Sequence, residues 1–161
     1  MNIIQRILGS HNTQIINLPS ENAVIDIVPQ DIEEILDFIN EGEGEKLGIL
    51  EMIQPDLDEK NKLNGIDEEQ RKLIDEDVPS FQEIEDCLRN NRNGNLRKKY
   101  TSAARILNVQ YMSKFQKNFP EFVVQVAKKY YDNGNTDCEN ISRLVSLMHY
   151  MYSECDIGIR P

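Results

Sequence analysis

The stretch "LMHYMYSECDIG", residues 147–158, is the densest run of aromatic and sulfur-containing side chains in the chain. In and just before it, apolar residues recur at a spacing that places them on one face of a helix, which is typical of packing against a core. Gly158 stands where a left-handed residue would close the helix. We therefore expect a packed terminal helix over residues 137–155 rather than a cofactor-binding motif. The residues of the expected inward face are Ile141, Leu144, Val145, Met148, Met151, Tyr152 and Cys155.

The chain from residue 30 onward shows the period of amphipathic helices, with apolar residues three and four positions apart and acidic residues between them. The charge-rich residues 56–65 predict a loop or a single helical turn. The expected fold is therefore mainly α: a bundle of five to seven helices that forms a helical interaction domain over residues 30–161. Besides the terminal helix, the expected helices span residues 30–41, 45–54, 67–77, 80–90, 96–117 and 121–133.

Two capping boxes are expected to mark helix starts. Ser80 lies three residues before Glu83, and Thr136 lies three residues before Glu139. In this motif the serine or threonine hydroxyl accepts from the third helical amide, and the glutamate side chain bonds back. Because Pro79 directly precedes the first box, we expect a separate helix to begin near residue 80.

The N-terminal residues differ in character from the rest of the chain. Residues 9–28 contain two β-branched runs, "TQIIN" and "AVIDIV", on either side of the turn-forming "LPSEN". This pattern predicts two short strands, possible partners in a hairpin, within a β-like arm over residues 1–29. An isolated hairpin is marginal in water, so the arm is expected to dock on the helices or to mediate self-association.

The charge of the chain is unevenly distributed. The net charge is −10, yet residues 21–90 carry 22 acidic against 6 basic side chains, and residues 91–129 carry 9 basic against 1 acidic. Either the two segments neutralise each other across the fold, or they form a polarised surface that steers a partner. The chain has no apolar run long enough to span a bilayer and no secretory signal, which predicts a cytoplasmic protein.

The sequence offers little for catalysis or for metal binding. Its three cysteines are odd in number and lack CxxC spacing, and its two histidines lack the spacing of zinc ligands. His149 and Cys155 are six residues apart, about 240° around a helix, so they cannot form a nucleophilic pair. We expect no cofactor, no metal and no enzymatic activity. If the chain is an enzyme of another type, Cys155 with Asp156 is the first place to look.

A nucleic-acid-binding regulator is the alternative function. The basic segment 92–129 would supply the phosphate contacts, although the strongly acidic segment 21–90 lies in the same small domain and opposes such binding. The candidate residues are Arg92, Arg97, Lys98, Lys99, Arg105, Lys114 and Lys117.

Three stretches together carry a family resemblance: "NLRKKYTSAARILNVQYMSKF" (95–115), "FPEFVVQVAKKYY" (119–131) and "RLVSLMHYMYSECDIG" (143–158). In this order they resemble the helical C-terminal domains of effector proteins in bacterial ABC-three-component anti-phage systems, the group that includes Lamassu. The acidic helices over 30–90 would complete such a domain. The stretch "GSHNTQII" is similar to segments that join effector and associated domains in bacterial conflict proteins.

The resemblance implies a non-catalytic coupling component that links an effector, often a nuclease, to an SMC-like ATPase sensor. Because no effector domain is present and the chain starts at Met1, we expect a stand-alone component, with the tail of a larger chain as the alternative. Contacts with partners are expected through the acidic helices, the arm or the "CDIG" end. The candidate partner-binding residues are Gln14, Ile15, Ile16, Asp156, Ile157 and Gly158.

Overall fold

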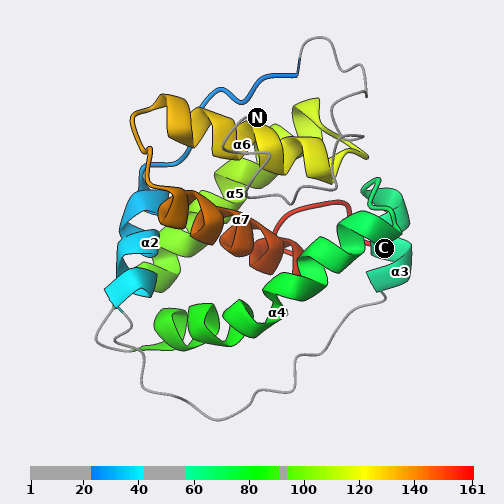
Figure 1. The fold of residues 1–161 in the computed structure, drawn as a ribbon. Coiled ribbons are helices and arrows are strands. Elements are labelled where there is room, and N and C mark those ends of the chain that lie inside the picture. Colours follow the sequence, from blue (N-terminus) through cyan, green and yellow to red (C-terminus); the bar gives the residue numbers. More distant parts are fainter. Residues whose placement is uncertain (1–22, 42–56, 91–93) are drawn as a thin grey trace.

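The computed structural model describes residues 23–41, 57–90 and 94–161, and within these ranges it confirms a mainly helical fold with six helices (Figure 1). Two predicted features, the helix over 45–54 and the strand around residues 13–17, lie outside the described residues. The helices are α2 (Asp31–Glu41), α3 (Leu57–Leu63), α4 (Glu68–Arg89), α5 (Leu96–Lys114), α6 (Phe119–Asp132) and α7 (Cys138–Ser153).

Helix α7 is the central element of the fold. It packs against α2, α4 and α6, which surround it in Figure 1. The sequence predicted one inward face, but the structure buries this helix on nearly every side, including Leu147, His149 and Tyr150. A helix surrounded by others buries residues all round, which explains why the stretch 147–152 is apolar or aromatic throughout, with His149 as its one ionisable imidazole.

Helix α4 is one helix where the sequence predicted two. Its 22 residues run through Pro79, and Figure 1 shows the helix changing direction part-way along. Ile74 before the proline and Phe81 after it are both buried, and α4 makes the most extensive contact with α7, so packing holds the helix together across the missing amide.

Both predicted capping boxes are wrong. The capping box of α4 is formed instead by Asp67 and Gln70, which exchange side-chain-to-backbone hydrogen bonds of 2.9 Å. At α7 the N-cap is Asp137, whose carboxylate accepts from the amide of Glu139 at 2.9 Å. The start of α7 thus lies one residue from the predicted position, because aspartate is a better N-cap acceptor than threonine.

The β-like arm is not supported in its described part. Residues 23–29 form no strand, although "AVIDIV" predicted one. Instead the side-chain amide of Gln110 on α5 accepts from the amides of Asp26 and Ile27, at 2.9 and 3.2 Å, and donates to the carbonyl of Ile27 at 2.9 Å. One glutamine thus supplies the donor and the acceptor that a neighbouring strand would supply.

The acidic and basic segments neutralise each other across the fold where they meet. Lys99 of α5 bonds to Glu34 of α2, and Lys114 lies 2.6 Å from Asp26. Arg97 lies 3.6 Å from Glu85 of α4. These contacts favour the first of the two interpretations of the charge pattern, because they join α5 to elements from the acidic half of the chain.

Two turns pack backbone against backbone at Gly65. This residue follows α3 with a φ of +70°, and a Cβ built there would lie 1.8 Å from the carbonyl oxygen of Lys117, in the turn before α6. The amide of Phe119 donates to the carbonyl of Asn64 at 3.0 Å and holds the same turns together. Only glycine leaves room for this contact.

Replacing Gly65 with alanine should therefore destabilise the fold far more than left-handed geometry alone does. Gly134 is the matched control, because it has a φ of +100° and a Cβ added there would meet nothing within 4 Å. We expect Gly134→Ala to cost about 1 kcal/mol and Gly65→Ala about 2 kcal/mol more, measured by urea denaturation. Equal costs for the two variants would contradict the close backbone contact.

Candidate interaction site

Three polar residues of α3 and its following turn hold the end of α7. Lys60, fully buried, donates from Nζ to the carbonyl of Tyr152, and this nitrogen lies 4.0 Å from the centre of the Tyr152 ring. Asn61 Oδ1 accepts from the Tyr152 hydroxyl at 2.9 Å. Burial lowers the pKa of the Lys60 ammonium, and the neighbouring Cys155 opposes that effect. Through its bond to the Tyr152 carbonyl, the Lys60 ammonium lies at the C-terminal end of α7, where the helix dipole favours a cation.

The third residue, Asn64, uses its whole side-chain amide. Nδ2 donates to the carbonyls of Lys60 and Ile159, at 2.7 and 2.9 Å. Oδ1 accepts from the Tyr111 hydroxyl and from the Ile159 amide, both at 2.7 Å. An amide side chain offers two donor hydrogens and two acceptor lone pairs, so this fully buried residue is satisfied.

The end of α7 is closed three residues before the predicted position. Cys155 takes the left-handed conformation, with a φ of +63°, and its amide donates to Tyr152 while the amide of Asp156 donates to Met151. This is the hydrogen-bond pattern of a Schellman motif, with cysteine where glycine is usual. Gly158 is also left-handed, but it lies further along the tail, where its amide donates to Asn108 Oδ1 at 3.0 Å.

The predicted partner-binding residues of the tail lie within the chain's own contacts. Ile157 and Gly158 are buried, and Asp156 Oδ2 accepts from the Tyr100 hydroxyl at 2.5 Å. Contact of these three residues with a partner stays a prediction. Gln14, Ile15 and Ile16, predicted to bind partners through the arm, lie outside the described residues.

Tyrosines and carboxylates meet beside the tail. The Tyr150 hydroxyl donates to Glu85 of α4, and the rings of Tyr100 and Tyr150 pack edge to face at 5.9 Å. Burial, followed by the neighbouring carboxylates, raises the pKa of both phenols. Both tyrosines are buried, so their hydroxyl groups hold α4, α5, α7 and the tail together.

A second polar cluster includes the histidine of α7. His149 Nδ1 lies 2.5 Å from Asp77 Oδ2 of α4, and the Ser146 hydroxyl donates to Asp77 Oδ1 at 2.9 Å. Histidine, aspartate and serine are the components of a hydrolytic triad, but here serine and histidine both bond to the aspartate. Asp77 thus links α4 to α7 twice. The serine hydroxyl donates to the aspartate carboxylate, and not to the histidine nitrogen that would act as its general base in a triad.

The basic segment is only partly available for an external ligand. Arg97, Lys99 and Lys114 take part in the ion pairs described above. Lys98, Arg105 and Lys117 are exposed and form no ion pair with another described residue. Arg92 lies outside the described residues.

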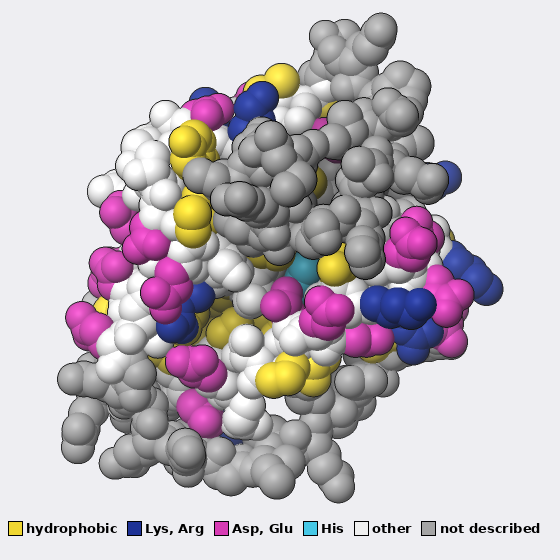
Figure 2. Space-filling model, in the orientation of Figure 1, with side chains coloured by type: hydrophobic (Ala, Val, Ile, Leu, Met, Phe, Trp, Pro, Cys, Tyr) yellow, Lys and Arg dark blue, Asp and Glu magenta, His cyan; other side chains and the backbone are white. Residues whose placement is uncertain are grey.

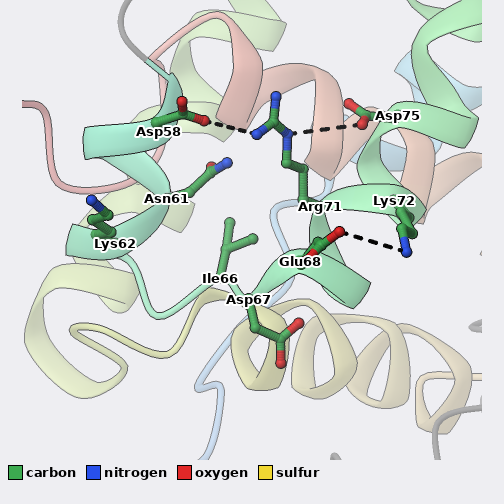
Figure 3. A pocket seen from close by; sticks show the side chains of 9 residues that line it. All are labelled: Asp58, Asn61, Lys62, Ile66, Asp67, Glu68, Arg71, Lys72 and Asp75. Atoms are coloured by element: carbon green, nitrogen blue, oxygen red, sulfur yellow. Dashed lines mark hydrogen bonds and ion pairs between the residues drawn. The ribbon is translucent and has the colours of Figure 1, made fainter.

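A pocket of about 490 Å³ lies between α3 and the N-terminal half of α4 (Figure 3). Arg71 extends between Asp58 of α3, at 2.8 Å, and Asp75 of α4, at 3.9 Å. Ile66 forms an apolar part of its lining, and the Asn61 side chain points into it. The sequence pattern did not indicate this site, because residues 56–65 were expected to form a loop or a single helical turn and Asp67 was not recognised as the N-cap of α4.

The described residues contain no group of three or more histidine, cysteine or acidic side chains placed to hold a metal ion. Among the described helices, none has the length and apolar character needed to cross a lipid bilayer.

These features define a helical domain whose buried polar side chains are engaged in joining its own helices. Residues 22–158 match the family model described as C-terminal domain 12 of the ABC-three component (ABC-3C) systems, and the chain belongs to this family. The match spans all six described helices. No curated protein and no solved structure matches the chain.

The stability of the fold should depend on pH through Glu154, whose charge acts on Tyr100 and Tyr150 of the tyrosine–carboxylate cluster. Glu154 is itself exposed, but partial loss of hydration raises the pKa of its carboxyl, as do Glu85 and Asp156, while Arg97 and Lys60 lower it. Because the folded pKa lies above the unfolded one, stability linked to Glu154 is present below the unfolded pKa and is lost as the pH rises through the folded pKa.

Glu154→Gln should therefore raise the thermal unfolding midpoint at pH 7.5, and the gain should shrink as the pH is lowered into the acidic range and the wild-type carboxyl takes up its proton. Circular dichroism melts across this range measure the effect. Glu69→Gln, on the exposed first turn of α4, is the control for loss of a single negative charge. A gain that stays constant with pH would rule out the titration of Glu154 as its cause.

Proposed function

We propose that this domain is a non-catalytic coupling component of a bacterial antiviral defence complex of the Lamassu type, located in the cytoplasm. In this role it links an effector, such as a nuclease, to an SMC-like ATPase sensor. The observation that carries the proposal is the family match over residues 22–158, because ABC-3C systems are of the antiphage-defence type and act through several components.

The internal use of polar groups supports a role without catalysis. The Ser146 hydroxyl is directed at Asp77, and Asp156 is engaged by Tyr100. Cys155, the nucleophile of the enzymatic alternative, is the left-handed residue that closes α7. Each of these groups has a structural task that accounts for its position.

The outer face of α2 is the best candidate for docking within the acidic helices. Glu33, Asp37 and Glu41 are exposed and recur every four residues, so they form one stripe along the helix. Figure 2 shows acidic side chains gathered along the edge of the molecule where α2 lies in Figure 1. A basic surface on a partner would be attracted to such a stripe. Self-association through the arm over residues 1–29 is a further part of the proposal.

Co-purification of the tagged chain from cells that express its neighbouring genes tests the coupling role. We expect the wild-type chain to retain an ATPase or a nuclease, and Asp37→Lys to lower the retained amount roughly fivefold because it places like charges together. Asp132→Lys, at the end of α6, is the matched control, since it makes the same charge change at another exposed position. A monomer that retains no partner would contradict the proposal.

A nucleic-acid-binding regulator is the second candidate. Lys98 and Arg105 are exposed and lie seven residues apart, on one face of α5. If this face binds phosphates, affinity for duplex DNA should fall steeply with salt, and Lys98→Glu with Arg105→Glu should flatten that dependence. Fluorescence anisotropy measures both quantities. Binding that is unchanged in the double variant would exclude this face, and the already paired Lys99→Glu serves as the comparison.

A further inference from the structure

The pocket between α3 and α4 holds a nearly buried donor that has no partner among the described residues. Asn61 is 8% exposed, and its Oδ1 is engaged by the Tyr152 hydroxyl. This bond fixes the orientation of the amide and turns Nδ2 toward the pocket, as Figure 3 shows. An amide group in such a position gains a hydrogen bond if a ligand brings an acceptor, and its conformation is already set.

The lining of the pocket has a small excess of acidic over basic side chains, and most of them are joined in ion pairs. Arg71 is held by Asp58 and Asp75, and Lys72 lies 3.9 Å from Glu68. Lys62 points away from the centre in Figure 3. The lining itself has four acidic side chains (Asp58, Asp67, Glu68 and Asp75) and three basic ones (Lys62, Arg71 and Lys72), a net charge of −1. The exposed Glu69 and Glu76 next to it on α4 add to the negative potential around the pocket.

The apolar part of the lining limits what the ligand can be. Ile66 is only 8% exposed and lies beside Asn61 in Figure 3, so a bound group meets an apolar surface next to the amide donor. A free inorganic cation would use neither feature. A lysine or arginine side chain would use both, because its methylene stem packs on apolar surface while its charged head stays among carboxylates.

We infer that this pocket binds a lysine or arginine side chain from a segment of a partner protein, with a backbone carbonyl of that segment accepting from Asn61 Nδ2. The methylenes of the bound side chain lie against Ile66, and its cationic head lies near Glu68 and Asp75. The pocket volume, about 490 Å³, is within the range of sites that accept small ligands. The inference rests on the proposed coupling role, since it names the chemistry of the partner.

The direct test is an NMR titration of the ¹⁵N-labelled full chain with capped tripeptides of the form acetyl-Gly-Xaa-Gly-amide. With arginine or lysine as Xaa, we expect saturable shifts of the Asn61 side-chain amide and of the Ile66 backbone amide. With glutamate as Xaa, we expect no shift of either. The Asn61 signal is the decisive readout, because general attraction to an acidic surface would not move the side-chain amide of a residue that is only 8% exposed.

Paired variants separate the pocket from the rest of the acidic helix. Glu68→Gln with Asp75→Asn removes two lining carboxylates. Glu69→Gln with Glu76→Gln removes two carboxylates that are also exposed but lie outside the lining, one residue further along α4. We expect the first pair to weaken arginine-peptide binding roughly five- to tenfold and the second pair less than twofold. Equal effects, stronger binding of the glutamate peptide, or an unshifted Asn61 amide would each overturn the inference.

Co-purification distinguishes this inference from the coupling role. If the wild-type chain retains its partner and the tripeptides leave Asn61 unshifted, the pocket assignment fails while coupling stands. If the arginine peptide shifts Asn61 in the wild-type chain but no protein is retained, the coupling role fails while the pocket remains a site for basic side chains. If Glu68→Gln with Asp75→Asn lowers partner retention and the control pair does not, both stand.

Discussion

The side-chain amide of Asn64 is the constraint on which the rest of the structure depends. It is completely buried, and its four hydrogen bonds join α3, α5 and the C-terminal tail. Each such bond contributes about 1 kcal/mol net, but a buried partner left without its bond costs more than that. Only asparagine and glutamine carry a side-chain amide with two donor hydrogens and two acceptor lone pairs, and asparagine has the shorter stem. The tail and two helices are therefore positioned by one side chain that the hydrophobic pattern does not reveal.

The helices could be predicted from the sequence, because apolar residues at helical spacing report burial directly. The period of α2 and the long apolar run of α7 both correspond to helices in the structure. The predictions failed where a local signal competed with packing. Pro79 predicted a break, yet Ile74 and Phe81 on either side of it are buried and α4 continues. The "AVIDIV" run predicted a strand, but its backbone bonds to Gln110, a residue 83 or 84 positions away that no local pattern connects to it.

The candidate site was harder to predict, because its residues belong to a segment whose composition is typical of a loop. Lys60, Asn61 and Asn64 are polar, and polar residues between helices normally face solvent. Here all three are buried, since each has a partner at the end of α7 or in the tail. The charge pattern was ambiguous for a related reason. Counting charges shows that opposite segments exist, but only the fold shows that Lys99, Lys114 and Arg97 meet acidic partners.

The site and the core share one residue, and this explains how a surface pocket can be well ordered. Asn61 faces Tyr152 with its oxygen and the pocket with its nitrogen, and it lies three residues before Asn64 in the chain. The side chain that we propose as a ligand contact is thus already held by the buried Tyr152. A ligand at this position does not have to order Asn61, so less of its binding energy is lost to conformational entropy. Arg71, placed between Asp58 and Asp75, is restrained in the same way by its two ion pairs. The proposed coupling role would require a rigid contact surface, and α3 has one face anchored in the core through Lys60 and Asn61.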